Sequence, residues 1–531
     1  MGTVMVTATG TVHTVRPRGR RHAGVSSGLA GAAIAGLLLL TAGAEAAEGW
    51  RSELGARTVL SFSDNIFLTQ RDPESDVVVE LQPYFNTNWR GRVSSAQVAY
   101  GPLLVGYLNN GDLSQTWQYL RATGTTEVIE DFFSLTATAQ ANPNVINRAN
   151  AGAGFDPLPN PGSYTQTASF SLVPSFTFPL IKAGDYADVA FSPGINLAFS
   201  AETAGGSDNA SSLGTSTSLS IASGSVFYRM PWSLNYSGDL FDVEQGSGFS
   251  RVWGEIGYRF SPRYRLDLLV GVDSQQVGDD FDNAGPGRDL GDGVRWQPRF
   301  TWTPNAETSA TIGIGQAAFG NDYYLNVSRR QKRFAFGLQY ASTVENSRQA
   351  ILRQQAIPFE DPFGNPILDP IGSGEVRQAI NTPTLVEETY VNSGLDAVLA
   401  FQGRRTTVSL NATVDWDRYQ FSDVETQQSL GSVSVNHRLT PRLSGRAAVL
   451  YQTYVQEPDV GLDYDQYRLE LALTYRLGRR TTAGLAAYLS QSSSDSEAAD
   501  VATGGLGSST RVGQTGNWDE NRISLTLSTT L

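Results

Sequence analysis

The feature of this chain that most restricts its fold is an alternation of apolar and polar residues. It returns in segments of about ten residues, as in residues 77–89, 264–272, 408–416 and 467–475. Successive side chains of a β-strand point to opposite faces, so each segment predicts a strand with one apolar and one polar wall. Strands of this length and pattern are typical of transmembrane β-barrels.

The connections between these segments alternate between short and long. The short turns lie near residues 90–92, 130–131, 179–186, 229–231, 261–263, 303–306, 330–332, 403–405, 439–441 and 478–480. The long links cover residues 140–162, 201–212, 274–292, 346–387 and 491–516. Outer-membrane barrels have short turns at the periplasmic end and long loops at the other end. A β-sandwich has no reason to separate its loops by length in this way.

The turns also predict the number of strands. Ten short turns join twenty strands, and further strands near residues 54–69 and 517–531 bring the total to 22, with a range of 20–24. The predicted fold is therefore all-β: a single transmembrane antiparallel β-barrel of about 22 strands, with short periplasmic turns and long extracellular loops.

Aromatic residues fall where a membrane-facing wall would place them. Trp296 and Trp302 share one apolar face, as do Tyr467 and Tyr475. At about 3.3 Å per residue, the two tryptophans lie about 20 Å apart, close to the height of the apolar band of a barrel. Trp253 and Trp518 fall instead on the polar side of the alternation, which predicts that they face the lumen or a loop.

The N-terminus predicts export. Four arginines between residues 16 and 21 precede an apolar run over residues 28–40 and small residues over 42–46. This order is that of a secretory signal peptide, and the apolar run is short for a membrane anchor, which needs about 20 residues. We therefore expect residues 1–46 to be a cleaved signal peptide and residues 47–531 to form a barrel in the outer membrane of a Gram-negative bacterium.

Composition limits the chemistry that the chain can perform. It has no Cys and three His, of which only His437 lies beyond the signal peptide. Thiolate and His-based metal sites are therefore not expected, although a Ser–His–Asp site around His437 stays formally open. We expect His437 to lie at the membrane edge beside the turn at residues 439–441. No pair of carboxylates stands out, so we expect no enzyme and no cofactor, and a formal net charge of −13 argues against nucleic acid as a partner.

The polar parity of the predicted strands carries charged residues that are candidates for lining the lumen. They are Glu80, Glu255, Arg259, Arg265, Asp267, Arg295, Arg299, Asp415, Arg468, Glu470 and Arg476. They indicate either a polar pathway for hydrophilic solutes, anionic ones included, or a wall of mutually paired charges, and the two interpretations are compatible.

Two long links suggest further roles. The link 274–292 holds five aspartates, which either bind calcium or form a solvated acidic loop. The link 346–387 contains five prolines and either constricts the lumen or covers the outer mouth. A 22-stranded barrel is also typical of plugged uptake transporters, but the segment before the first strand is too short for a plug domain.

One part of the chain resembles a known family. The run from Phe62 to Leu68 reads FSDNIFL, and it is followed by Ser75-Asp76, Leu81-Gln82-Pro83, Arg90-Gly91-Arg92, Tyr100 and Tyr107. Over residues 56–146 the chain resembles the outer-membrane β-barrel proteins associated with PEP-CTERM/exosortase systems, which accompany exopolysaccharide loci. Asp64-Asn65 is also consistent with a purely structural feature at the outer end of the first strand.

The resemblance implies a role in exopolysaccharide export or surface assembly, as a passive conduit or scaffold. The implied partners are outer-membrane lipid, the exopolysaccharide, a separate periplasmic adaptor and inner-membrane polysaccharide machinery. Two alternatives remain open: a general diffusion porin for small hydrophilic solutes, and a barrel that anchors polysaccharide at the cell surface.

Overall fold

The computed structural model describes residues 50–70, 72–145, 164–181, 185–202, 208–242, 247–276, 292–345, 390–419, 424–457, 463–494 and 517–530. The predicted signal peptide lies outside the described residues, as do almost all of the acidic link 274–292 and the Pro-rich link 346–387. The predictions made for these three segments therefore stay predictions.

The described residues form 22 β-strands. The first eleven are β1 (Arg51–Ser63), β2 (Asp76–Arg90), β3 (Ser94–Tyr107), β4 (Gln115–Ile129), β5 (Phe133–Val145), β6 (Tyr164–Ile181), β7 (Ala187–Glu202), β8 (Asp208–Ser223), β9 (Trp232–Asp242), β10 (Ser247–Ser261) and β11 (Tyr264–Gln276). The others are β12 (Gly293–Asn305), β13 (Thr308–Ala317), β14 (Gly320–Gln331), β15 (Phe334–Glu345), β16 (Tyr390–Gln402), β17 (Thr406–Tyr419), β18 (Glu425–Arg438), β19 (Leu443–Glu457), β20 (Tyr464–Arg476), β21 (Thr481–Ser493) and β22 (Trp518–Thr530).

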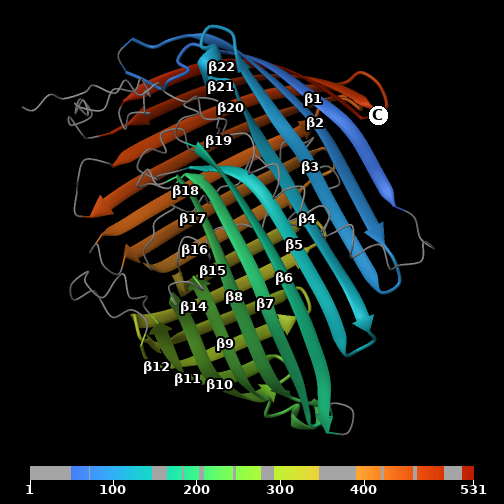
Figure 1. Cartoon of the computed structure of the whole chain (residues 1–531), viewed down its shortest axis with the longest axis vertical. Helices are drawn as coiled ribbons and strands as arrows, with labels where there is room; N and C mark the ends of the chain where they lie inside the picture. The colour runs from blue at the N-terminus through green and yellow to red at the C-terminus, as the bar shows by residue number, and fades with distance from the viewer. Residues whose placement is uncertain are drawn as a thin grey trace, which may run out of the picture.

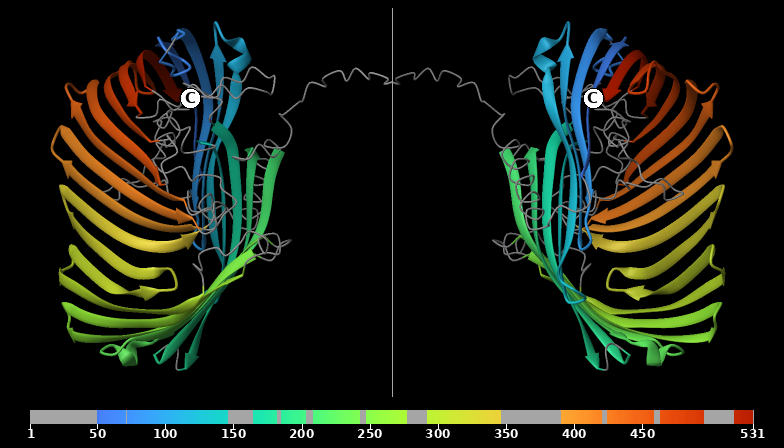
Figure 2. Two further views of the ribbon diagram at one scale, coloured as in Figure 1. Left: turned by 90° about the vertical axis from the view of Figure 1, so that its left-hand side faces the viewer. Right: turned by 90° about the vertical axis from the view of Figure 1, so that its right-hand side faces the viewer.

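The sheet closes on itself. Each strand pairs antiparallel with its neighbours in the chain, and β1 pairs with β22 from Gly55↔Thr530 to Ser63↔Arg522. In Figure 1 the strands of one wall, β2 to β7, cross those of the opposite wall, β15 to β21, as the tilted strands of a barrel must. Figure 2 shows the strands arranged around a common interior. The predicted fold class, a single antiparallel barrel of 22 strands, is confirmed.

The connections also follow the predicted alternation. The ten turns that follow even-numbered strands, from β2–β3 to β20–β21, lie at one end of the barrel, together with the start of β1 and the end of β22. This end is periplasmic by the rule that short turns face the periplasm. One connection at the other end is also tight: only two residues join β13 to β14, and Gly320 adopts the positive φ of 115° that this turn requires.

Several predicted boundaries are wrong. The links 140–162 and 201–212 were expected to lie outside the strands, but β5 extends to Val145 and β8 begins at Asp208. The first strand was expected to reach residue 69. Instead β1 ends at Ser63, and Ile66 and Leu68 are buried in a turn. The side chains of Asp64 and Asn65 bond to β22 and its backbone, which turns the chain away from the strand direction.

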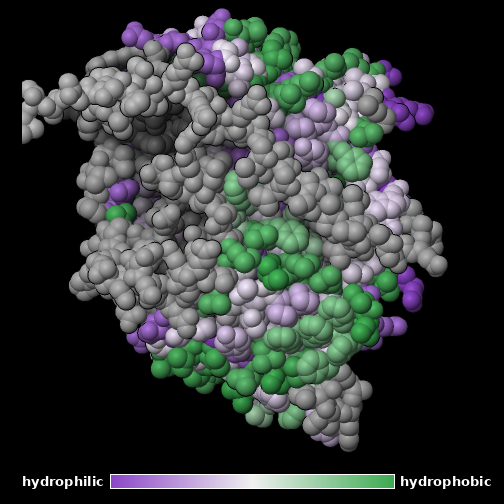
Figure 3. Space-filling model, in the orientation of Figure 1, coloured by the Kyte–Doolittle hydropathy of each residue, from purple (hydrophilic) through white to green (hydrophobic). Residues whose placement is uncertain are grey.

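The outer face of the barrel is apolar. Along β11, for example, Leu266, Leu268, Val270 and Val272 are each at least 43% exposed. Figure 3 shows apolar side chains gathered over the strands labelled β4 to β8 in Figure 1. Such exposure is expected where lipid, rather than water, covers the surface. Among the described residues no helix is long and apolar enough to cross a membrane.

Candidate functional site: the inner face of the barrel

The inner face is set by strand register. Residues directly opposite each other on antiparallel strands share a face. In β10 and β11 the pairs Val252↔Val272 and Ile256↔Leu268 lie outside, while Arg251↔Asp273 and Gly257↔Asp267 lie inside. Trp253 falls on this inner parity, and so does Trp518, which is buried. Trp296 and Trp302 lie outside and are exposed, as the sequence predicts.

All eleven charged residues that the sequence predicts for the lumen lie on the inner parity of their strands. They are Glu80 on β2, Glu255 and Arg259 on β10, Arg265 and Asp267 on β11, Arg295 and Arg299 on β12, Asp415 on β17, and Arg468, Glu470 and Arg476 on β20. Some of them pair with each other, as the second interpretation expects. That they line a pathway for a solute stays a prediction.

The inner face of β10 to β14, which we name the charged section, brings six of the eleven into contact with partners. Arg265 donates to Glu255 Oε1 through Nη2 at 3.0 Å and to Asp267 Oδ1 through Nε at 2.5 Å. Arg259 and Arg299 lie instead over aromatic rings. Their guanidinium carbons are 4.6 Å from the ring centroids of Tyr228 and Tyr324, respectively.

Three further members of the charged section were missed by the sequence analysis. Arg251 pairs with Asp273 at 2.6 Å, and Asp322 pairs with the predicted Arg295 at 2.7 Å. Asp273 immediately precedes a predicted loop, and Asp322 precedes a segment with only weak alternation. Extending the polar parity by a few residues at each strand end would have found Arg251, Asp273 and Asp322.

The remaining predicted residues are spread around the barrel. Arg468 lies over the ring of Tyr488 at 4.5 Å, and Glu470 is 3.5 Å from Arg446. Asp415 accepts from Asn392 at 3.4 Å, a long hydrogen bond. Glu80 is buried, whereas Arg476 is exposed at the periplasmic end. The charges therefore do not converge on a single cluster.

Glycines let the long side chains of the charged section lie flat against the wall. Gly271 is paired with Arg295, and Gly313 with Arg299. A Cβ added at Gly313 would stand 2.9 Å from Arg299 Cγ, and one at Gly271 would stand 2.5 Å from the backbone oxygen of Val252. At Gly313 the side chain of Arg299 occupies the space that a larger residue would need, and at Gly271 the backbone of β10 and Trp253 occupy it.

The inner face of β5 to β9 has a different chemistry, and we name it the hydroxyl wall. Its inward residues are mainly Ser, Thr, Asn and Gln: Ser134, Thr136, Thr138, Gln140, Ser169, Ser171, Ser175, Thr177, Ser192, Asn196, Ser216, Ser218, Ser220, Ser233, Asn235 and Ser237. Asp188, Glu202, Asp208 and Asp239 are the charged residues at the inward parity of these strands.

Hydrogen bonds run across the hydroxyl wall from strand to strand. Ser171 Oγ donates to Asn196 Oδ1 at 2.7 Å, and Asn196 Nδ2 donates to Ser216 Oγ at 3.1 Å, which joins β6, β7 and β8. Ser220 Oγ donates to Asn235 Oδ1 at 2.7 Å. Hydroxyls keep further donor and acceptor capacity, so this wall can also bond to a solute.

At the outer end of β1 to β4, the turn that follows β1 packs against the barrel wall. Ile66 and Leu68 pack into an apolar cluster that includes Leu103, Trp117 and Trp518. This cluster lies on the inner face, so the lumen wall is apolar here rather than polar.

The residues of the family resemblance have structural roles in this region. Asp64 Oδ2 accepts from Asn521 Nδ2 at 2.7 Å, and Asn65 Nδ2 donates to the Asp519 carbonyl at 2.9 Å. Both contacts hold the seam between β1 and β22. Asp76 accepts four hydrogen bonds, three of them from Asn109 and Asn110 in the next outer turn. The structural interpretation of Asp64-Asn65 is thus supported by its contacts.

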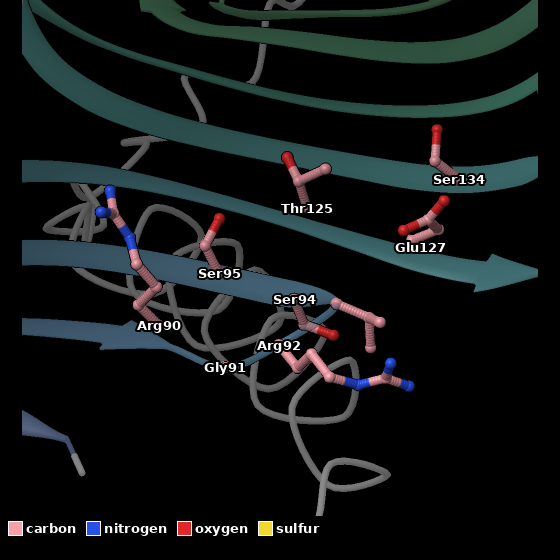
Figure 4. A pocket seen from close by; sticks show the side chains of 9 residues that line it. Arg90, Gly91, Arg92, Ser94, Ser95, Thr125, Glu127 and Ser134 are labelled. Atoms are coloured by element: carbon pink, nitrogen blue, oxygen red, sulfur yellow. The ribbon is translucent and has the colours of Figure 1, made fainter. Parts of the chain in front are cut away.

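At the periplasmic end, an open hollow lies beside the β2–β3 turn (Figure 4). Arg90, Arg92, Ser95, Glu127 and Ser134 are among the residues that line it. Two arginines and one glutamate are among the lining residues, and Glu127 Oε1 already accepts from the backbone amide of Asp131 in the β4–β5 turn at 2.7 Å. The hollow is open and its lining residues do not form a constellation for catalysis.

Metal and acid–base chemistry find little support in the described part of the chain. It contains no group of three or more His, Cys, Asp or Glu placed to hold a metal ion. His437 is exposed beside the turn before β19, where its Nδ1 lies 2.7 Å from Thr406 Oγ1. That the chain is not an enzyme stays a prediction.

Comparisons with known proteins add little. No family model matches the chain, and no characterised protein matches its sequence. Solved structures give weak likenesses. A mutant of the ferric enterobactin receptor PfeA from Pseudomonas aeruginosa has 10% identity and a TM-score of 0.45, over 91% of this chain and 82% of that one. The siderophore receptor PirA from Acinetobacter baumannii has 8% identity and a TM-score of 0.43, over 91% and 80%. The outer-membrane protein OmpT from Vibrio cholerae has 7% identity and a TM-score of 0.34, over 91% and 100%.

Likenesses of this size carry no argument about function. The closed strand order, the apolar outer face and the polar inner face define the class on their own: this chain is an outer-membrane β-barrel of a Gram-negative bacterium.

Proposed function

We propose that the barrel is a passive conduit for exopolysaccharide across the outer membrane. The observation that carries the proposal is the hydroxyl wall, which offers hydrogen-bonding groups over five neighbouring strands, β5 to β9, with little charge. Sugar hydroxyls can exchange hydrogen bonds with such groups and with bridging water. The resemblance of residues 56–146 to barrels that accompany exopolysaccharide loci points the same way.

Weak and repeated contacts suit transport. A pathway must bind its solute well enough to admit it and weakly enough to release it. A net hydrogen bond between neutral groups contributes about 0.5–1.5 kcal/mol, so no single site on the wall would trap a chain of sugars. We propose no cofactor and no catalytic step. A periplasmic adaptor and inner-membrane polysaccharide machinery are the proposed partners.

The proposal is tested in a deletion strain complemented with the wild-type chain. Exopolysaccharide is measured in the medium, on the cell surface and in the periplasm. Loss outside the cell with accumulation in the periplasm supports a conduit. Polysaccharide released but not retained on cells would instead favour an anchor, and unchanged amounts in all three places would remove the proposal.

A matched pair of substitutions tests whether the pathway runs along the hydroxyl wall. Ser218 on β8 is exposed on the inner parity, while Leu234 on β9 is 47% exposed on the outer face. We expect Ser218→Trp to reduce export several-fold by adding bulk to the pathway. Leu234→Trp adds the same ring on the lipid side and should leave export unchanged. Equal effects of the two substitutions would contradict a pathway along this wall.

A diffusion porin is the second candidate, and the same hydroxyl wall favours it. Bilayer conductance separates the two functions. Steady ion conductance by the purified barrel, together with normal exopolysaccharide in the deletion strain, would identify a porin.

A further inference from the structure

A continuous band of positive charge lies along half of the periplasmic end. It consists of ten arginines and one lysine on four neighbouring turns, β14–β15, β16–β17, β18–β19 and β20–β21. We name it the basic arc: Arg329, Arg330, Lys332, Arg333, Arg404, Arg405, Arg438, Arg442, Arg476, Arg479 and Arg480. All eleven side chains are exposed. The four turns contain no acidic residue, although the whole chain has a formal net charge of −13.

Backbone hydrogen bonds tie these turns into one surface. The amide of Gln402 donates to the Arg333 carbonyl at 2.9 Å, and that of Arg438 donates to the Arg405 carbonyl at 2.8 Å. Arg476 bonds to the Arg442 carbonyl in the same way, at 2.8 Å. Neighbouring turns therefore stand about 10 Å apart, two strand spacings, in a fixed order.

None of the eleven cations forms an ion pair with any residue that the structure describes. Like charges gathered at this density repel one another, so the arc lowers stability unless something anionic covers it. The barrel itself gives no structural reason for the arc.

The rest of the periplasmic end is different. The turns from β2–β3 to β12–β13 carry acidic and basic residues in similar numbers. The acidic ones are Glu127, Glu130, Asp131, Asp185, Asp188 and Glu307, and the basic ones are Arg90, Arg92, Lys182, Arg229, Arg259, Arg263 and Arg265. The four turns of the basic arc therefore carry a large positive net charge, whereas the net charge of the other six turns is close to zero.

We propose that the basic arc captures acidic polysaccharide, bearing carboxylates such as those of uronic acids, at the periplasmic mouth. Guanidinium groups present a planar pair of donors that matches a carboxylate, and a lysine ammonium does not. The predominance of arginine in the arc, ten of its eleven cations, therefore favours a carboxylate ligand. Arg330, Arg438 and Arg476 lie on the inner parity of their strands, so the arc leads from the turns toward the lumen. This inference rests on the proposed function and adds the class of polymer that is carried.

Two other anionic partners fit the arc less well. Annular phospholipid surrounds a barrel on all sides, whereas the arc covers four turns of ten. Lipid also cannot reach residues of the inner parity. An acidic periplasmic protein would match the charge, but the inner-parity arginines would then face the lumen without a role.

The test measures binding to the purified full-length barrel in neutral detergent. The probes are polygalacturonate, which is anionic, and dextran of similar length, which is neutral. The arc variant is Arg404→Gln, Arg405→Gln, Arg438→Gln and Arg442→Gln combined. The matched control removes four exposed arginines from the other half of the same end: Arg90→Gln, Arg92→Gln, Arg229→Gln and Arg263→Gln.

We expect polygalacturonate to bind more tightly than dextran and to weaken as salt is added. The arc variant should lose about tenfold or more in affinity, because four charge-assisted contacts are weakened, while the control should change little. Absence of polygalacturonate binding, equal binding of the two polymers, or equal losses in the two variants would each overturn the proposal. If the arc variant bound polygalacturonate as tightly as the wild type and differed only in its binding to phosphatidylglycerol vesicles, the arc would be a lipid contact. That result would likewise overturn the proposal.

Failure of this inference is distinguishable from failure of the proposed function. If the deletion strain loses export of an acidic polymer but the arc variant restores it fully, the conduit stands and the capture role fails. If the deletion strain exports normally while the purified barrel still binds polygalacturonate through the arc, the conduit fails and the binding site stands.

Discussion

The hydroxyl wall and the charged section are neighbours in one sheet, yet they satisfy their polar groups in different ways. In the hydroxyl wall, short side chains bond directly across the strands, as Ser171 does to Asn196 at 2.7 Å. In the charged section, long side chains reach their partners as ion pairs, as Arg295 does to Asp322 at 2.7 Å. The backbone geometry is the same, so side-chain chemistry alone separates the two regions.

The difference teaches how a wide barrel can stay polar inside without losing stability. Neutral hydroxyls cost little when one is removed, because water can replace them. Buried charges cost much more when a partner is removed, because the remaining charge has no compensation. The charged section should therefore be sensitive to single substitutions and the hydroxyl wall tolerant of them.

The largest effect is expected at Arg295 and Asp322, whose side chains are 7% and 3% exposed. Asp322→Ala leaves the Arg295 guanidinium buried without its carboxylate and should lower the free energy of unfolding by about 3–5 kcal/mol. Reversible urea unfolding in lipid vesicles measures it. The double variant Arg295→Met with Asp322→Leu removes both charges and should recover most of the loss. A single variant no less stable than the double variant would break the comparison.

A smaller effect is expected from filling the space above a glycine. At Gly271 an added Cβ would stand 2.5 Å from the Val252 carbonyl oxygen and 2.6 Å from Trp253 Cβ. Gly271→Ala should therefore force the β10–β11 backbone apart, at a cost of about 1–3 kcal/mol.

Gly337 on the inner face of β15 is the matched control, since no atom lies within 4 Å of a Cβ added there. The thermal transition of Gly337→Ala should be unchanged or slightly higher. If both alanine variants unfolded at the same temperature, close packing around the inner-face glycines would not be a property of the charged section.

The smallest effect is expected in the hydroxyl wall. Ser171→Ala removes one neutral hydrogen bond to Asn196 and should cost about 0.5–1.5 kcal/mol, measured by the same urea unfolding. A loss as large as that of Asp322→Ala would show that the two regions do not differ in the way described here.

Much of the fold could be predicted from the sequence, because the alternation of period two is local. It indicates which residues face lipid and which face inward, and the lengths of the turns indicate the strand number. Trp296, Trp302 and the eleven inward charges all lie on the predicted parity.

Cross-strand partners could not be predicted, since they depend on register between segments that are distant in the chain. Ser63 donates to Glu520 at 2.8 Å across the barrel seam, and no local pattern connects these two residues. The end of β1 was misplaced for the same reason. Asp64 and Asn65 turn the chain through contacts with β22, which lies at the other end of the sequence.

The basic arc was also missed, although every residue of it is visible in the sequence. Its turns are separated by two strands each, so the charges appear as scattered pairs such as Arg404-Arg405 and Arg479-Arg480. Only the strand order brings the four turns side by side.

The central claim is that the polar inner face forms a water-filled path across the outer membrane. The chain has no Cys, so single cysteines can be placed without background. Ser218→Cys on the hydroxyl wall and Leu234→Cys on the outer face are treated in intact cells with a small, charged maleimide. The account predicts that the cysteine at position 218 is modified and the one at position 234 is not. Modification at position 234 without modification at position 218 would contradict it.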